Sequence, residues 1–172
     1  MHVSSNFPRQ RRPLPDPRTD VSADDMCIRL LIVVGLVTAA ASSEVAICPG
    51  EGPRYGDFRC NHDSTHRVCA KLVESDKDSA PLSWGPAGDF WSITGQKAFQ
   101  WNDRIVAEPN SGDSWCICMW ATASLIERVG CANVHLRCEA TDVDYVLQSY
   151  HDSGKRLDAA HQCIREKCLA PK

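Results

Sequence analysis

Gly112-Asp-Ser-Trp-Cys-Ile-Cys-Met-Trp-Ala-Thr-Ala123 contains the strongest indications of secondary structure in this sequence. It places Cys116 and Cys118 two residues apart between two tryptophans. Side chains alternate between the two faces of a strand, so the stretch predicts a strand over residues 114–119. One face would carry Trp115, Ile117 and Met119, and the other Cys116 and Cys118. Such a concentration of large apolar residues predicts the centre of a folded domain.

The spacing of the apolar residues changes directly after this strand. Ala121, Leu125 and Val129 fall on one stripe of a helix, and Gly130 stands where a helix commonly ends. The sequence therefore predicts a strand that runs straight into a helix.

Further elements are predicted on both sides of this unit. Alternating apolar residues predict strands over residues 66–72 and 134–140. Thr141-x-x-Asp144 resembles a capping box that opens a short helix, and residues 154–169 are amphipathic. Residues 74–88 predict a long loop, and residues 90–106 predict limited regular structure. The fold class predicted is α+β: a small disulfide-stabilised domain with a few strands, two or three helices and long irregular loops.

Residues 26–43 have the pattern of a signal peptide. Arg29 precedes an apolar run over residues 30–37, and Ala39-Ala40-Ala41 has the small side chains that a signal peptidase recognises. The run is shorter than the about 20 apolar residues that span a bilayer, and the alternative is a buried core segment. Residues 1–25 are rich in proline and arginine, a composition that predicts a disordered leader. The alternatives are a long first part of the signal peptide, an appended targeting sequence, or a true start of the protein at Met26.

The domain organisation follows from this processing. We expect a mature chain that begins near Ser42 or Glu44, an α+β domain over residues 44–147, and a C-terminal helical extension over residues 148–172 packed on the domain. We expect no transmembrane segment in the mature chain. The predicted localisation is secreted or in the lumen of an endomembrane compartment.

Cysteine usage favours the same compartment. The chain has 10 cysteines, of which Cys27 lies in the predicted signal peptide. The other nine are numerous enough to predict disulfides in an oxidising compartment, and their odd number leaves at least one without an intramolecular partner. The candidates for disulfide formation are Cys48, Cys60, Cys69, Cys131, Cys138, Cys163 and Cys168.

The C-terminal pair of cysteines carries a geometric prediction. Cys163 and Cys168 lie five residues apart, so a helix points them in different directions. They should not bond each other, and at least one should reach a cysteine outside residues 154–172.

Two blocks of the sequence resemble a known family. Gly56-Asp-Phe-Arg-Cys60 with His66-Arg-Val-Cys-Ala70, and Gly112-Asp-Ser-Trp-Cys-Ile-Cys118 followed by Glu139-Ala-Thr141, are similar to motifs of the uncharacterised domain of unknown function 2237 family. The resemblance covers about residues 56–147. It implies a compact α+β domain and supplies no activity. This chain lacks the family's Cys-Cys pair near Cys60 and has Asp142 where the family has a histidine.

The cysteines and histidines define one candidate cluster for thiol or metal chemistry: Cys60, His62, His66, Cys69, Cys116 and Cys118. Zinc prefers tetrahedral Cys and His ligands, but the spacing from Cys60 to Cys69 matches no known finger, so whether a metal is bound is left open. The alternative is a Cys60–Cys69 or other disulfide, with both histidines on a solvated loop.

Three further chemical interpretations concern the cysteines and the tryptophans. Cys116 and Cys118 cannot bond each other within a strand, because residues two apart are about 6.6 Å apart along the chain. A thiol nucleophile would need Cys69, Cys116 or Cys118 beside His66 or His135, and we expect His135 to be exposed. The five tryptophans could stack a ligand, although burial in the core is the commoner outcome. These are Trp84, Trp91, Trp101, Trp115 and Trp120.

Composition narrows the function further. The chain has 19 Lys+Arg against 22 Asp+Glu and no basic stripe with interleaved aromatics, so we expect no nucleic-acid partner. We predict a secreted or lumenal cysteine-rich domain with a binding or structural role, without catalysis and without a cofactor. Its ligand is unknown, and a protein partner is one option. The alternative is a thiol-dependent redox or metal-binding protein centred on the Trp-Cys-Ile-Cys segment.

Overall fold

The computed structural model describes residues 44–52, 55–152 and 154–170, which belong to the unit that begins at Ala41. The predicted leader, residues 1–25, and the predicted signal peptide, residues 26–43, lie outside the described residues. Within the part of the chain that is described, none of the helices combines the length and apolarity that a membrane span requires.

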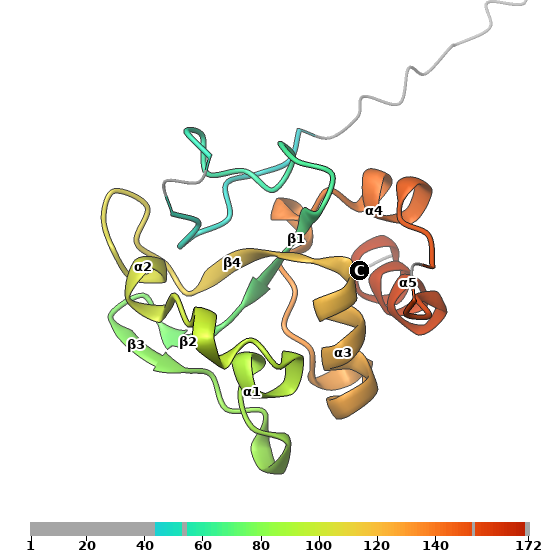
Figure 1. Cartoon of the computed structure of the whole chain (residues 1–172). Helices are drawn as coiled ribbons and strands as arrows, with labels where there is room; N and C mark the ends of the chain where they lie inside the picture. Colours follow the sequence, from blue (N-terminus) through green and yellow to red (C-terminus); the bar gives the residue numbers. More distant parts are fainter. Residues whose placement is uncertain (1–43, 53–54, 153, 171–172) are drawn as a thin grey trace, which may run out of the picture. The chain divides into compact units, whose positions relative to one another are not determined.

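An antiparallel pair of strands lies at the centre: β1 (His66–Lys71) and β4 (Ser114–Cys118) (Figure 1). Both strands were predicted, and the structure confirms them. Ala70 pairs with Trp115, and these residues contribute to the larger hydrophobic core. Cys69 pairs with Cys116, and these two contribute to a smaller core on the other face. The strand pair is thus buried on both sides.

The helix α3 (Met119–Val129) follows β4 without a connecting loop. Its buried face includes Ala121, Leu125 and Ile126, and it ends at Gly130, whose N–H donates to the carbonyl of Ile126. Gly130 has φ 78°, a backbone conformation that glycine adopts without the steric cost of a side chain. The predicted passage from strand to helix is confirmed.

The strand predicted over residues 134–140 is wrong in extent. The segment pairs with β1 at one point, between Ala70 and Leu136, and is flanked by the 3₁₀ turns Cys131–Asn133 and Cys138–Ala140. Beyond that point the side chain of Thr141 takes the place of a backbone partner, because its Oγ1 accepts from the N–H of Cys69 at 3.0 Å. Alternation alone does not reveal this substitution.

The same hydroxyl explains a shift in the start of α4 (Val143–Ser149). Thr141 was predicted as the capping residue, but its Oγ1 is engaged with Cys69 and donates to the carbonyl of Arg137. Asp142 caps the helix instead, and its carboxylate accepts from the N–H of Tyr145.

Helices and short turns cover the strand pair. The predicted loop over residues 74–88 is instead a hairpin, β2 (Val73–Ser75) and β3 (Asp78–Pro81), followed by a 3₁₀ turn. Its largely exposed strands carry no apolar alternation that would have predicted them. The region after it contains the short helices α1 (Phe90–Thr94) and α2 (Asn102–Ile105). The limited regular structure predicted over residues 90–106 is confirmed.

The C-terminal segment is helical, as predicted, but begins later than residue 154. It consists of α5 (Asp158–Ile164) and a π-helical turn, Arg165–Leu169. α3 packs against α1 and α5, and α4 packs against β1. Figure 1 shows α3 continuing from the end of β4, with α5 beside it. Short antiparallel strands covered by helices and closed by disulfides confirm the α+β class.

Candidate functional site

Cysteine pairing separates the candidate residues into two groups. Eight of the cysteines form disulfides: Cys48–Cys69, Cys60–Cys116, Cys131–Cys163 and Cys138–Cys168. Among the described residues, Cys118 is the free cysteine. The odd cysteine expected from the sequence is therefore located at the junction of β4 and α3.

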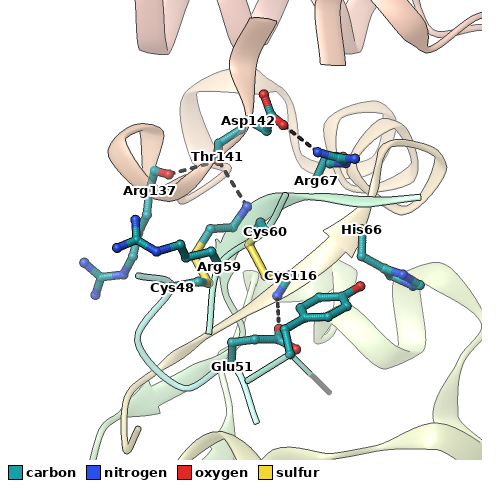
Figure 2. Close-up of a disulfide and its surroundings, with 12 residues drawn as sticks. Cys48, Glu51, Arg59, Cys60, His66, Arg67, Cys116, Arg137, Thr141 and Asp142 are labelled. Atoms are coloured by element: carbon teal, nitrogen blue, oxygen red, sulfur yellow. Dashed lines mark hydrogen bonds and ion pairs between the residues drawn. A yellow bond between two sulfur atoms is a disulfide. The ribbon is translucent and has the colours of Figure 1, made fainter. Parts of the chain in front are cut away.

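Two of the disulfides lie side by side on one face of the strand pair. Cys69 and Cys116 are register partners, and each is bonded to a cysteine of the N-terminal segment. Figure 2 shows the Cys60–Cys116 bond beside Glu51, whose Oε2 accepts from the N–H of Cys116 at 2.8 Å. The sulfurs of Cys48, Cys60 and Cys69 lie within 4.8 Å of one another. All three belong to disulfides, so they offer no thiolate to a metal.

The other two disulfides attach the C-terminal helical segment. Cys163 of α5 bonds Cys131, and Cys168 of the π-helical turn bonds Cys138. The prediction that Cys163 and Cys168 do not bond each other, and that at least one reaches a cysteine outside residues 154–172, is confirmed. The extension is thereby fixed to the segment that follows α3.

The free thiol of Cys118 lines a pocket with aromatic walls. The walls are formed by Phe90, Trp91, Phe99, Trp101 and Trp115. His66, Gln96 and Cys118 supply polar or reactive groups. The empty space is about 410 Å³ with its open mouth included, of which about 80 Å³ is open to the centres of water-sized molecules. Aromatic walls with few polar groups are typical of small-ligand sites.

One rim residue of the pocket is unusually exposed. Phe99, on the 3₁₀ turn Lys97–Phe99, has a relative exposure of 62%. Trp101 and Trp115, further along the wall, meet edge to face with ring centroids 5.5 Å apart. Trp115 belongs to the buried core, so the pocket extends from the exposed Phe99 to the core of the domain.

Cys118 lies in a different environment from Cys116. The β1–β4 register shifts between His66 and Val68, so Arg67 is an extra residue on β1. At this point β4 ends and Cys118 becomes the N-cap of α3, where its Sγ accepts from the N–H of Ala121 at 3.4 Å. The prediction that Cys118 shares the face of Cys116 is wrong, because Cys118 is half-buried and packs against the larger core.

His66 lies directly opposite Cys118 across the two strands. Its Nδ1 is 2.8 Å from Oδ2 of Asp63, a residue that the sequence did not single out. Asp63 also accepts from the backbone N–H groups of Thr65 and His66, each at 2.6 Å, and from the hydroxyl of Tyr55. Burial acts to raise the pKa of Asp63, but these hydrogen bonds outweigh it and hold the pKa well below its ordinary value.

Tyr150 contacts the turn that holds Asp63 and Thr65. The residue is buried, its hydroxyl donates to the carbonyl of Thr65, and its ring lies 5.4 Å from that of Trp120. Burial, followed by the charges of Cys118 and Asp63, raises the pKa of Tyr150 far above its ordinary value. Tyr150 therefore acts as a neutral hydrogen-bond donor that fixes the turn before β1.

The remaining sequence candidates lie elsewhere. His62 pairs with Asp57 and stacks on Tyr55, with ring centroids 4.9 Å apart. His135 is exposed, as expected, and lies against the ring of Trp84. In Figure 2 the labelled His66 lies to one side of the Cys60–Cys116 bond. The six-residue cluster suggested by the sequence is thus divided between two disulfides, a surface histidine and the Cys118–His66 pair.

Part of the pocket could be anticipated from the sequence and part could not. The tryptophans Trp91, Trp101 and Trp115 were considered as a ligand-stacking surface, and the structure brings them together at the pocket. Asp63 gave one local signal: it precedes His66 by three residues. Comparisons with protein-family models, curated proteins and solved structures found no match.

Proposed function

We propose that this protein is a secreted or lumenal binding domain that holds a small apolar ligand, or the apolar end of a larger one, in the aromatic pocket. The observation that carries the proposal is the convergence of aromatic side chains from the α1 region and β4 around an open cavity. Four disulfides support the compartment, since bonds of this number persist where the environment is oxidising.

The size of the pocket limits the ligand. An apolar cavity of about 150 Å³ is large enough to admit benzene. With about 80 Å³ open to water-sized molecules, this pocket takes a smaller group. A short aliphatic or thioether group suits the aromatic walls, because sulfur makes favourable contacts with aromatic rings. His66 and Gln96 can hydrogen-bond a polar end at the wall.

The pocket can be tested with 2-(methylthio)ethanol, which carries a thioether and one hydroxyl. The indole N–H signals of the five tryptophans are followed by NMR during a titration. The signals of Trp91, Trp101 and Trp115 should move, whereas Trp84 and Trp120, which do not line the pocket, serve as internal references. Equal movement of all five signals, or no movement, would contradict the proposal.

A pair of variants separates the pocket from general surface apolarity. Phe99→Ala removes the exposed rim of the pocket and should weaken binding several-fold. Leu169→Ala is the matched control, because Leu169 is similarly exposed at 56% and lies outside the pocket.

A second experiment tests the proposed secretion. The chain is expressed in a eukaryotic host, and N-terminal sequencing of protein from the medium should show cleavage between Ala41 and Glu44.

The thiol-dependent alternative is favoured by one observation, the free Cys118 in the wall of this pocket.

We also propose membership of the domain of unknown function 2237 family. Its support is that His66, Cys116, Cys118 and Thr141, which match the family's motifs, lie together around the β1–β4 pair. A solved structure of a bacterial member with a different strand order would contradict that membership.

A further inference from the structure

Cys118 and His66 both line the aromatic pocket, and His66 is hydrogen-bonded to Asp63. Side chains directly opposite each other in an antiparallel pair have Cβ atoms about 4.5–5.5 Å apart. His66 and Cys118 are such partners, and both line the pocket. The carboxylate of Asp63 accepts a hydrogen bond from Nδ1–H of His66, so that Nε2 is the acceptor whenever the imidazole is neutral. A thiol, a base and a group that orients the base are thus placed in sequence.

The sulfur of Cys118 lies at the N-terminus of α3. Sγ of Cys118 accepts from the N–H of Ala121 at the first turn of α3, a helix of 11 residues. The N-terminus of a helix carries partial positive charge, which stabilises a thiolate. The other charged or titratable groups around the cluster are Arg67, which pairs with Asp142, and the neutral Tyr150.

We propose that Cys118 captures a small thiol as a mixed disulfide, by exchange with a low-molecular-weight organic disulfide. The inference rests on the proposed pocket. His66 accepts the proton of the Cys118 thiol, and the sulfur attacks the nearer sulfur of the disulfide. The new bond joins Cys118 to one half of the ligand, the original S–S bond breaks, and the departing thiolate takes the proton back from His66. One disulfide is consumed and one is formed, so no further oxidant is required.

The ligand class follows from the size of the pocket and from the compartment. A protein with four disulfides is suited to an oxidising compartment, and small organic disulfides also persist there. The pocket accommodates one short half of such a molecule against aromatic walls, and its open mouth lets the other half leave. A bulky anionic disulfide exceeds this space, which distinguishes the pocket from a merely exposed thiol.

The reaction can be followed with bis(2-hydroxyethyl) disulfide and intact-protein mass spectrometry under native conditions. The full chain should gain a mercaptoethanol half at Cys118, located by peptide mapping and counted apart from Cys27, and Cys118→Ser should gain none at that position. At pH 7, His66→Gln should react about fivefold more slowly, since transfer of the thiol proton to the base is lost. Above about pH 9.5, where an ordinary thiol ionises unaided, the two rates should converge.

His135→Gln is the matched control, because His135 is an exposed histidine outside the pocket, and its rate should equal that of the unmodified sequence. Asp63→Asn tests the positioning role and should give a rate between those of the original protein and His66→Gln at pH 7. Absence of an adduct, or an unchanged rate in His66→Gln at pH 7, would overturn the inference.

The unreactive sulfide 2-(methylthio)ethanol keeps the two proposals separate. If the sulfide shifts the pocket tryptophans but the disulfide forms no adduct, the exchange proposal fails and the pocket stands. The aromatic thiolate of 5,5′-dithiobis(2-nitrobenzoic acid) leaves faster than mercaptoethanol does, so each rate of Cys118 is divided by the rate of free cysteine with the same disulfide. If the two quotients are equal, the pocket does not select its ligand, and the inference fails.

Discussion

Cys116 and Cys118 lie two residues apart in β4 and both line the aromatic pocket, yet Cys116 is bonded to Cys60 in the smaller core, whereas Cys118 is free and caps α3. The extra residue Arg67 on β1 and the end of β4 separate the two environments. The sulfur of Cys116 stabilises the domain as part of a disulfide, whereas the thiol of Cys118 is free to react.

This division predicts unequal losses of stability on removing each sulfur. The Cys60→Ser/Cys116→Ser double variant opens a link between residues 56 apart and should lower the free energy of unfolding by about 4 kcal/mol in the chain-entropy model. Cys118→Ser should cost about 1 kcal/mol or less, because serine is itself a favoured N-cap. Urea unfolding of both variants measures the difference. A larger loss for Cys118→Ser would show that the free sulfur has a structural role.

Asp113 should make stability depend on acid. Burial acts to raise its pKa, but hydrogen bonds from Ser114 and Arg137 and the charges of Arg137 and Lys71 lower it below the ordinary 3.8. A lowered folded-state pKa gives stability that is present above about pH 4 and is lost as the pH falls through the folded-state value. Asp113→Asn should therefore cost about 1–3 kcal/mol at pH 7 and much less at pH 2. Unfolding at both pH values tests this, with the exposed Asp103→Asn as the control. An equal cost at the two pH values would contradict it.

Gly112 is required by a close approach of two backbones. A Cβ placed there would lie 2.1 Å from the carbonyl carbon of Pro49, so the two segments would have to separate. Gly112→Ala should lower the free energy of unfolding by about 3 kcal/mol. Gly56→Ala is the control, since its Cβ would meet nothing within 4 Å, and it should change stability by about 1 kcal/mol or less. Thermal unfolding compares them; similar melting temperatures would show that the Pro49 segment yields freely.

The hydroxyl of Thr141 should be worth more than its methyl group. It accepts from Cys69 and donates to Arg137 in a buried setting, so Thr141→Val leaves a backbone N–H without its partner. The expected loss is about 1–3 kcal/mol in urea unfolding. Thr141→Ser keeps the hydroxyl and should lose less than the valine variant. The reverse order would show that packing of the methyl group dominates at this position.

The sequence by itself determined the centre of the fold. Residues around Cys116 encode a strand and then a helix, because the period of two and the helical stripe are both local properties of the chain. Local geometry likewise directed Cys163 and Cys168 to different partners, since five residues on a helix cannot bring the two sulfurs together. The sequence also required that at least one of the nine cysteines lack an intramolecular partner, because nine is an odd number.

Only the tertiary structure decided which cysteine is free and what surrounds it. Nine cysteines allow far too many pairings for the sequence to choose among them, and the choice depends on the β1–β4 register and the extra residue Arg67. The strand predicted after α3 was shortened because the Thr141 hydroxyl replaces a backbone partner. Asp63 and Phe99 join the site through contacts or surfaces formed by folding, so composition and spacing carry little trace of them. The aromatic pocket depends on packing between residues far apart in the sequence. The strands and the helix that carry its residues depend on local sequence patterns.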